Sequence, residues 1–572
     1  MKARDYQADC LDSIHSEWET VTSTVAVLPT GCGKTCIFAL GILDRKPRRA
    51  LVVAHREELI WQAKEKIMQF TGMECGIEMA DYYTNSSLFG EMPVVISTIQ
   101  TLNSKWGDRK RMGRFRPEDF DTLIIDECHH ATAPSYRSVI NYFKQNPKLK
   151  ILGVTATPDR ADEEALGQVF DTVAFDYEIL DAIHDGWLVP ISQQFVNISG
   201  LDFSEVKTTA GDLNGADLAA VMEAEKIMQG VTGAAIEIIG SKRAILFTCS
   251  VKQAEQASEI FNRHRVGMAD WVCGETNKDD RRSKLDQFKR GEIQVMCNCG
   301  VLTEGFDDPG VEIILMGRPT KSRSLYAQMA GRGTRPLPGL VDALEGKEAR
   351  SRAILESAKP ECLIVDFVGN SGKHKLMSSA DILGGKVSDE AINRAILKAK
   401  ASGGAVRMDA ALTEEEELLR AKIEKARLAA EAQRARLVAK VKYVAKKINP
   451  FDVFDIQPVK QRGWDSDKAL SQKQSSFLMK QGVNPDDFNY SQNRQIIGEM
   501  MRRFTHKLCT IKQAQLLQRF GYDTKNMKFE KASELITSLK SKGWKRETPV
   551  IAPSPAPAAP APTTHDEESP FH

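Results

Sequence analysis

The sequence lacks several features that would narrow its function at once. Its 572 residues hold 78 lysines and arginines against 77 aspartates and glutamates, a formal net charge of only +1. A polyanion such as DNA could therefore be bound only at a local basic region. No run of about 18 apolar residues occurs, so we expect no membrane span. The first ten residues, MKARDYQADC, lack the apolar stretch of a secretory signal.

Cysteine is present but follows no pairing pattern. None of the eleven cysteines forms a C-x-x-C pair, so we expect no zinc site built from four cysteines. The closest pair, Cys297 and Cys299, alternates along an expected strand and so shares one face. Scattered thiols are typical of a reducing compartment, and we therefore predict a cytoplasmic protein.

What is present, from Val25 to about Phe367, is a regular alternation of short apolar runs and amphipathic stretches. Continuous β-branched runs between helices are typical of buried parallel strands in layered α/β domains. A break near Pro190 predicts two such domains, at residues 1–189 and 190–370. The runs are Val25–Leu28, Ala50–Ala54, Val94–Ser97, Thr122–Ile125, Ile151–Val154, Ala244–Phe247, Ile293–Cys297, Val311–Met316 and Cys362–Phe367.

The last third of the chain differs. Residues 371–411 contain two Gly-Gly pairs and predict an irregular linker. Residues 412–448 predict a long charged helix that starts at a capping box on Thr413. Its thin apolar seam is typical of a solvated arm packed on the rest of the protein. Coiled-coil pairing with a partner is the alternative.

A duplication follows the helix. The segment Leu470 to Gly482 aligns with the segment Cys509 to Gly521, and each reads as helix, glycine turn, short loop, helix. Two units are too few for an open solenoid, so they predict one small helical domain at residues 467–545. Its modest basic character leaves DNA binding and docking of a protein partner both open. Residues 546–572 predict a disordered Pro/Ala tail with an acidic tip.

A glycine-rich turn lies between the first apolar run and a helix. The general P-loop pattern has a glycine where Leu28 stands, so the tight turn depends on Gly31 and Gly33. In such a turn, backbone N–H groups face phosphate oxygens. Lys34 would neutralise the β- and γ-phosphates and Thr35 would hold Mg²⁺. The predicted ATP-binding residues are Pro29, Thr30, Gly31, Cys32, Gly33, Lys34 and Thr35.

Two adjacent carboxylates, Asp126 and Glu127, end another apolar run. Asp126 is suited to the water shell of Mg²⁺, and Glu127 to orienting or deprotonating the attacking water. Two ionised neighbours repel each other unless a cation compensates. A purely structural role for this pair is therefore a poor explanation.

Together these motifs resemble superfamily-two helicases of the DEAD/DEAH-box-like class, with the variant Asp-Glu-Cys-His at residues 126–129. The resemblance covers roughly residues 1–370. It implies two tandem RecA-like parallel-sheet domains, followed here by the α-helical C-terminal region. It also implies ATP and Mg²⁺ as cofactors. Gln7 resembles the residue that contacts the adenine base, and Thr155 and Thr157 resemble the motif that couples ATP to strand binding.

The second domain carries matching motifs. Asp307 matches the position that approaches the ribose and Mg²⁺ in this family. The segment from Gln328 to Arg335 resembles the arginine-finger motif, in which Arg332 and Arg335 would reach the γ-phosphate from the opposite domain. Gln328 is included as a catalytic residue on the same basis. A finger arginine can supply about 10³–10⁵ in rate.

In this family the nucleic acid crosses both domains on the side opposite the nucleotide. Polar segments after successive strands match the backbone-contacting motifs, and such groups suit phosphates without reading sequence. Ser and Thr at these places are also common helix caps. The predicted contacts are His55, Arg56, Ser97, Thr98, Gln100, Thr248, Ser250, Thr303 and Glu304.

The finger motif favours DNA over RNA as the partner. RNA-specialised members typically carry His where Gln328 stands, and the chain resembles the branch that holds restriction-enzyme motor subunits and phage helicases. The resemblance implies an ATP-dependent DNA helicase or translocase in replication, recombination or repair, in a bacterial cell or phage-infected host. The alternatives are the motor subunit of a restriction-type complex and a nucleic-acid-binding adaptor that ATP switches.

Overall fold

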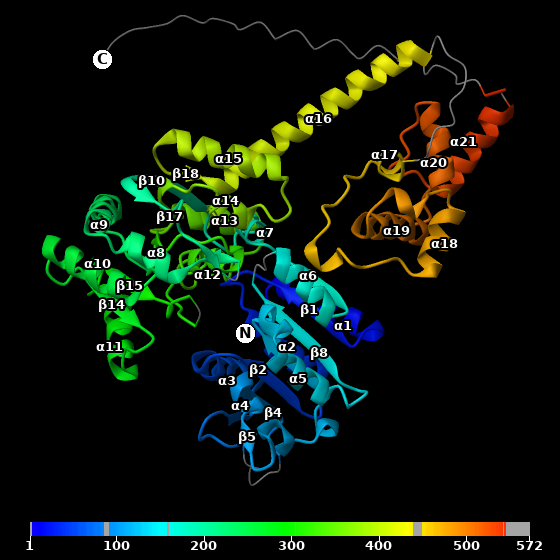
Figure 1. The fold of residues 1–572 in the computed structure, drawn as a ribbon. Helices are drawn as coiled ribbons and strands as arrows, with labels where there is room; N and C mark the ends of the chain where they lie inside the picture. The colour runs from blue at the N-terminus through cyan, green and yellow to red at the C-terminus, as the bar shows by residue number, and fades with distance from the viewer. Residues whose placement is uncertain are drawn as a thin grey trace, which may run out of the picture. The chain divides into compact units, whose positions relative to one another are not determined.

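The computed structural model describes residues 3–84, 91–156, 160–209, 211–303, 305–438, 449–541 and 543–544. The chain divides into two compact units. Unit 1 is Met1–Tyr443 together with Arg462–Asp467, and unit 2 is Val444–Gln461 together with Lys468–His572. Unit 1 holds two parallel-sheet domains and unit 2 is helical, which confirms the predicted fold class (Figure 1). Thr157, Glu304 and the predicted tail lie outside the described residues.

The first sheet has seven parallel strands in the order β3-β4-β2-β7-β8-β1-β9. Its central strands are buried along almost their whole length because helices cover both faces. The strands are β1 (Ser23–Val27), β2 (Ala50–Ala54), β3 (Cys75–Glu78), β4 (Val94–Thr98), β7 (Thr122–Asp126), β8 (Lys150–Thr155) and β9 (Thr172–Asp176). The main helices are α1 (Asp5–Thr20), α2 (Lys34–Arg45), α3 (Glu57–Thr71), α4 (Ile99–Asn103), α5 (Pro134–Phe143) and α6 (Arg160–Val169).

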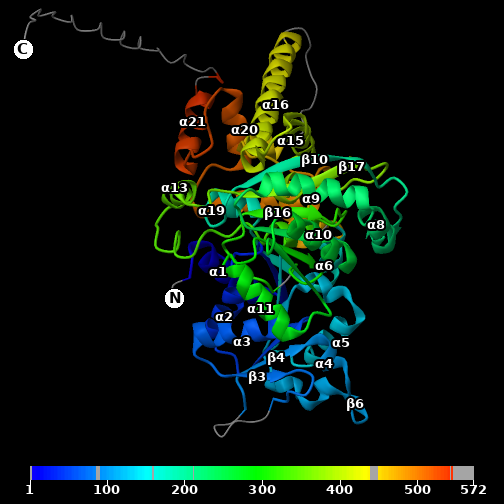
Figure 2. The same ribbon diagram turned by 90° about the vertical axis from the view of Figure 1, so that its left-hand side faces the viewer.

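The second sheet also has seven strands, in the order β14-β15-β13-β16-β17-β10-β18, and only β18 runs antiparallel. Figure 2 shows α9 and α10 among the helices over this sheet. The strands are β10 (Ile191–Asp202), β13 (Ala244–Thr248), β14 (Ala269–Cys273), β15 (Val295–Cys299), β16 (Ile313–Gly317), β17 (Cys362–Asn370) and β18 (Val406–Arg407). The helices include α7 (Ile179–His184), α8 (Gly215–Met222), α9 (Glu225–Ile239), α10 (Val251–His264), α11 (Lys278–Lys289), α12 (Arg323–Ala330) and α13 (Lys347–Glu356).

The expected irregular linker at residues 371–411 is wrong. This segment forms α14 (Ser379–Leu383), α15 (Asp389–Ser402) and the edge strand β18, and its apolar side chains belong to the main core of unit 1. A side chain at Gly384 would collide with Ile392, and one at Gly385 would collide with the Glu178 carboxylate. These glycines therefore permit close packing instead of breaking the chain.

The long charged helix also starts elsewhere than expected. Helix α16 spans Met408–Val438, so Thr413 lies inside it and its hydroxyl donates to the Asp409 carbonyl, 2.9 Å away. The first turns are buried, whereas residues 421–429 are exposed. The predicted end of this helix, residues 439–448, lies outside the described residues.

A short segment beyond this helix returns to unit 1, which the sequence did not predict. Trp464 is only 6% exposed within the core of the first domain. A Cβ on Gly167 of α6 would lie 2.6 Å from the Trp464 carbonyl oxygen, so the two backbones touch. Arg462 forms ion pairs with Asp176 and Glu178, which precede α7. Residues 462–467, called the strap below, thus belong to unit 1.

Unit 2 contains two helical hairpins and one short leading helix. The hairpins are α18 (Gln472–Lys480) with α19 (Tyr490–Thr505), and α20 (Ile511–Arg519) with α21 (Phe529–Ser541); α17 (Pro450–Phe454) precedes them. The same capping box opens α18 and α20, which reflects the duplication. Leu478, Ile496, Leu517 and Ala532 share one core, so the two hairpins form a single small body.

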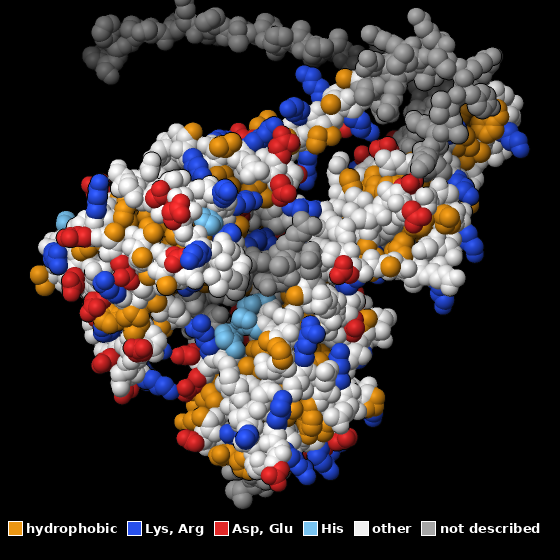
Figure 3. Space-filling view, in the orientation of Figure 1, with side chains coloured by type: hydrophobic (Ala, Val, Ile, Leu, Met, Phe, Trp, Pro, Cys, Tyr) orange, Lys and Arg blue, Asp and Glu red, His pale blue; other side chains and the backbone are white. Residues whose placement is uncertain are grey.

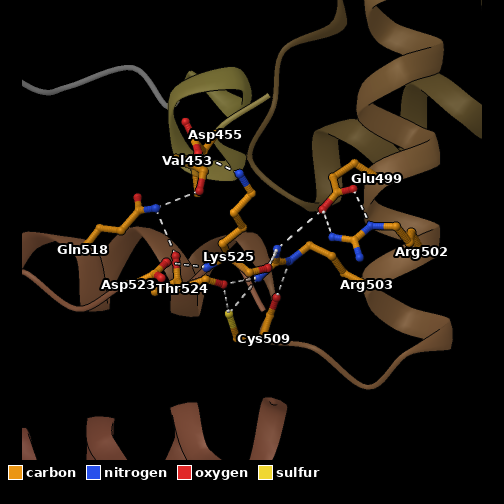
Figure 4. Close-up of polar contacts among 10 residues, drawn as sticks. All are labelled: Val453, Asp455, Glu499, Arg502, Arg503, Cys509, Gln518, Asp523, Thr524 and Lys525. Atoms are coloured by element: carbon orange, nitrogen blue, oxygen red, sulfur yellow. Dashed lines mark hydrogen bonds and ion pairs between the residues drawn. The ribbon is translucent and has the colours of Figure 1, made fainter. Parts of the chain in front are cut away.

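A buried arginine ties the hairpins of unit 2 together (Figure 4). Arg503, near the end of α19, is 3% exposed. Its guanidinium donates to the carbonyls of Cys509 and Thr524, each at 2.8 Å, and of Lys525 at 2.9 Å. Because these acceptors belong to the second repeat, one side chain of the first repeat satisfies three of its carbonyls.

Candidate functional site

The glycine-rich turn has the geometry of a phosphate-binding loop. Gly31 and Gly33 have φ angles of 96° and 71°, which side chains rarely tolerate. Helix α2 begins at Lys34, so Lys34 and Thr35 occupy its first turn, where free N–H groups and the helix dipole favour an anion. Gln7 of α1 closes the other side, with its Nε2 3.3 Å from the Cys32 carbonyl.

The two carboxylates lie at the same edge of the sheet as this turn. Asp126 ends β7, and Glu127 follows with a φ of 48°, an unusual left-handed conformation for a non-glycine residue. The Nζ atom of Lys34 lies 2.6 Å from Glu127 Oε1. Strands β1 and β7 are both parallel to β8, which lies between them, so their carboxyl ends meet. The fold thus brings Lys34 and Glu127 together across 93 residues.

The electrostatic environment separates the two carboxyls. Burial raises the pKa of Asp126, and repulsion from Glu127 raises it further. Burial also acts to raise the pKa of Glu127, but the Lys34 ammonium and the hydrogen bond from His129 outweigh it and lower that pKa. Of the two carboxyls, Glu127 therefore keeps its negative charge to the lower pH.

A histidine links these carboxylates to the next strand. The Nδ1 atom of His129 lies 3.1 Å from the hydroxyl of Thr155, the last residue of β8. The His129 and His130 rings are 4.0 Å apart, and His130 and His55 are 4.9 Å apart, centre to centre. Figure 3 shows a pale-blue histidine patch on this face. A continuous side-chain path therefore connects Glu127 with the end of β2.

The second domain presents its charged residues to the same place. Arg335 forms an ion pair with Asp307. Burial lowers the pKa of Arg335 to about 10. Arg332 donates to the carbonyls of Phe306, at 2.5 Å, and Thr303, at 2.8 Å. Both finger-motif arginines are thus held against the segment that carries Asp307.

Two glycines allow the domains to approach here. A Cβ on Gly31 would lie 3.2 Å from the Cγ of Arg335, so the arginine passes directly over the turn. A Cβ on Gly331 would lie 2.7 Å from the Cβ of Thr30 in the same way. Further contacts between the domains include Lys278 with Glu57 at 2.9 Å and Arg281 with Glu58 at 3.2 Å.

One cavity of about 700 Å³ collects most of the predicted ATP-site residues from both domains. Cys32 does not line it, because its side chain is buried beneath the turn. Gln328 does not line it either and is buried in α12, so the structure gives no contact for the catalytic assignment. The predicted residues that do line it are Gln7, Pro29, Thr30, Gly31, Gly33, Lys34, Thr35, Asp126, Glu127, Asp307, Arg332 and Arg335.

The cavity also has lining residues that the sequence did not suggest. Arg4 pairs with Asp342 of the second domain at 2.7 Å, and Gln62 of α3 donates to the Gly305 carbonyl. Lys66 and Lys289 add positive charge from α3 and α11. The spacing of residues in the sequence reveals none of these. Arg4 alone lies close to a predicted site residue, three positions before Gln7.

The predicted strand-contacting residues fall into two groups. Ser97, Thr98, Thr248 and Thr303 are buried, and Ser250 caps α10 by accepting from the Gln253 amide. Thr98 caps α4 in the same way, and Ser97 and Thr248 donate to carbonyls within their own domains. Gln100 is exposed and His55 and Arg56 partly exposed at the ends of neighbouring strands β4 and β2, and the Gln100 side chain donates to the His55 carbonyl at 3.2 Å. Among the predicted contacts that the structure describes, these three lie at the surface at neighbouring strand ends.

Comparison with known proteins places the two domains in families. Residues 1–160 match the family described as "Type III restriction enzyme, res subunit", and residues 230–336 match the "Helicase conserved C-terminal domain". Both matched stretches lie within the two sheet domains and are similar to restriction-enzyme and helicase sequences. The chain is 31% identical over 403 residues to "Putative ATP-dependent helicase IRC3" of Saccharomyces cerevisiae, which covers 68% of this chain and 54% of that protein.

A restriction enzyme is also among the proteins to which this chain is similar. The "Type I restriction enzyme EcoAI endonuclease subunit" of Escherichia coli is 24% identical over 361 residues, covering 57% of this chain and 43% of that protein. The chain thus spans about half the length of these curated relatives. A solved structure of the DNA-bound restriction-modification enzyme LlaBIII shares the fold, with a TM-score of 0.50 at 14% identity, over 95% of this chain and 40% of that one.

The described residues lack two further features. Among the described residues, no group of three or more His, Cys, Asp and Glu side chains could hold a metal ion. No helix in the same part of the chain is long and apolar enough to cross a membrane.

Proposed function

We propose that the chain is an ATP-dependent DNA helicase or translocase that hydrolyses ATP in the cavity between its two sheet domains. One observation carries this proposal. Lys34, Thr35, Asp126 and Glu127 of one domain line the same cavity as Asp307, Arg332 and Arg335 of the other. Phosphoryl transfer depends on positioning and charge neutralisation, and this cavity offers both.

The oxygen donors of the cavity suit Mg²⁺. The Thr35 hydroxyl and the Asp126 carboxylate are hard oxygen ligands beside the phosphate-binding turn. When bound, Mg²⁺ would neutralise phosphate charge. Ionisation of Asp126, whose pKa burial and Glu127 raise, would accompany its binding.

Glu127 is our candidate for the group that orients the attacking water and takes its proton. In this structure the Lys34 ammonium lies 2.6 Å from Glu127 Oε1 and stabilises the negative charge of that carboxylate. When Lys34 turns to the β- and γ-phosphates of ATP, that attraction weakens and the basicity of Glu127 rises. Water then attacks the γ-phosphate, the bond to ADP breaks, and the proton passes to Glu127.

The arginines would complete the site on closure. Arg335 already crosses Gly31, and a small movement from Asp307 would bring its guanidinium to the γ-phosphate. Arg332 donates to the carbonyls of Thr303 and Phe306, so these two residues would move together with the finger motif. Because the site is complete only when both domains contribute, hydrolysis and release would reopen it and move the domains.

DNA is the partner that we propose. His55, Arg56 and Gln100 lie at neighbouring strand ends, and the histidine path joins them to Glu127. The restriction enzymes among the relatives support DNA over RNA. The cytoplasmic location stays a prediction, because one relative, from Schizosaccharomyces pombe, is named as a mitochondrial helicase.

A second candidate is the motor subunit of a restriction-type complex. The family matched by residues 1–160 is the observation that favours it. Co-purification with a nuclease or methyltransferase would support this candidate. A chain that stays alone but unwinds or translocates on DNA would support the first.

An ATPase assay tests the proposal directly. Steady-state turnover is measured with no nucleic acid, single-stranded DNA, duplex DNA, forked DNA and RNA. We expect stimulation by at least one DNA and little by RNA, and no turnover in Glu127→Gln. Stimulation by RNA alone would contradict the choice of DNA, and wild-type turnover in Glu127→Gln would contradict the site.

A further inference from the structure

Unit 2 carries an open apolar groove that the ATP chemistry does not use. Its volume is about 810 Å³, and residues from α17, α18, α19, α20 and the start of α21 line it. Three of its apolar side chains are unusually exposed: Phe504 at 81%, Met501 at 51% and Phe529 at 47%. Exposed phenylalanines that gather on one concave surface are typical of a binding site, because large apolar side chains are otherwise buried when a domain folds.

Two lysines stand at the rim of this groove. The Phe529 amide donates to the Lys507 carbonyl at 2.9 Å, and Leu508 pairs with Lys528 in an isolated β-bridge. These contacts fix Lys507 and Lys528 at one edge. Within the described residues, no carboxylate lies within ion-pairing distance of either ammonium. The groove therefore offers an apolar floor beside two uncompensated positive charges.

The chain itself contains a segment of complementary chemistry. Residues 566–571 read Asp-Glu-Glu-Ser-Pro-Phe, three acids followed by one aromatic ring. A proline- and alanine-rich spacer separates them from Trp544. At roughly 3.1 Å per residue for an extended proline-rich chain, this spacer is long enough to reach any point on a domain of this size.

We propose that residues 566–571 dock in this groove, with Phe571 among Phe504, Met501 and Phe529 and the acids beside Lys507 and Lys528. Tethering favours the contact, since a short flexible connection gives an effective concentration in the millimolar range. The bound segment shields the groove and can be displaced by a partner that offers the same acidic and aromatic chemistry.

Single-stranded DNA is a less suitable occupant. A DNA strand needs a track of cations for its phosphates as well as aromatic rings for its bases. The lining holds two lysines, of which Lys528 also donates to the His506 carbonyl at 3.0 Å, and its arginine is engaged with carbonyls. A short acidic peptide with one aromatic anchor requires no such track.

The test uses the full chain and a version that ends at Thr564. A fluorescent peptide of residues 562–572 is titrated into both, and anisotropy reports binding. We expect binding to the shortened chain to be at least tenfold tighter than to the full chain, in which the tethered segment competes. Equal affinity for the two chains would overturn the proposal.

Variants on both sides locate the contact. Phe571→Ala in the peptide, and Phe504→Ser or Lys507→Glu in the shortened chain, should each weaken binding at least tenfold. Met479→Ser and Lys473→Glu are the matched controls, because both residues are exposed on α18 and do not line the groove. Controls as damaging as the groove variants would contradict docking at this place.

Other occupants give distinct results. Binding of a labelled oligo-dT strand that Phe504→Ser abolishes, without peptide binding, would assign the groove to DNA and overturn the proposal. A concentration-dependent dimer in sedimentation that Phe504→Ser dissolves would assign it to a second copy and overturn it as well. None of these measurements requires ATP, so their outcome is independent of the proposed function.

Discussion

The cavity between the sheet domains and the groove of unit 2 are of similar size but opposite character. The cavity is lined by many charged side chains from loops at strand ends and from helices, whereas the groove is lined largely by phenylalanines and methionines from four helices. A charged cavity needs its side chains at fixed points, because charge interactions depend steeply on distance and burial. An apolar groove needs only area and shape, so its residues can vary more freely.

The largest expected effect is on ATP turnover, which should depend on the cavity and not on the groove of unit 2. Lys34→Ala removes the ammonium that lies beside Glu127 and at the phosphate-binding turn, and should lower ATP turnover by on the order of 10³-fold. Binding of the peptide to unit 2 should not change. Lys144→Ala, an exposed lysine after α5, is the control and should keep wild-type turnover. Steady-state ATPase near wild type in Lys34→Ala would contradict the site.

The second prediction concerns the stability of unit 2. Arg503→Met leaves three carbonyls, two of them in buried hydrogen bonds, without their charged donor and should destabilise this unit by about 3–5 kcal/mol. Thermal unfolding should then show an early transition for unit 2, while ATPase activity survives at moderate temperature. Arg502→Met, next to it but exposed and paired only with Glu499, should cost about 0–1 kcal/mol. Equal destabilisation by the two variants would mean that the Arg503 contacts are not the source of the lost stability.

The contrast also explains which parts of the molecule the sequence could predict. The nine central strands were predictable because each is a continuous apolar run buried on both faces. Strands β3, β9, β10, β14 and β18 were missed. Four of them lie at sheet edges and include polar residues such as Glu78, Asp270 and Arg407, and the inner strand β10 carries polar residues such as Gln193. Pattern recognition needs a face that is uniformly apolar, and edge strands have none.

The same reasoning applies to the sites. Lys34 and Asp126 could be found because parallel strands bring their carboxyl ends to one edge, so spacing in sequence translates into proximity. Trp464 and Arg462 could not be found, since a single turn that packs on α6 has no period. The groove was equally invisible, because exposure of Phe504 depends on how two hairpins pack and not on the local pattern.

A third, smaller effect tests the close approach of the two domains. Gly31→Ala places a methyl group 3.2 Å from the Arg335 side chain at a φ of 96°, so both the turn and the arginine must shift. We expect turnover to fall by about 10- to 100-fold, at a cost of about 1.4–2.7 kcal/mol in the barrier. Gly41→Ala in α2, whose methyl group meets Leu11 at an ordinary 3.5 Å, is the control and should keep its turnover. Similar loss in both variants would exclude a specific role for the turn.

The last prediction compares two places at which unit 2 can be removed. A chain that ends at Asp467 keeps the strap on the first domain and should retain its basal ATPase and the unfolding temperature of unit 1. A chain that ends at Gln461 loses Trp464 and the partner of Glu178. It should therefore unfold at lower temperature, since burial of a large aromatic side chain is worth about 1.5–3 kcal/mol. The two shortened chains differ only in residues 462–467. If the basal ATPase and the unfolding temperature of unit 1 fall in both, the rest of unit 2 contributes to them as well.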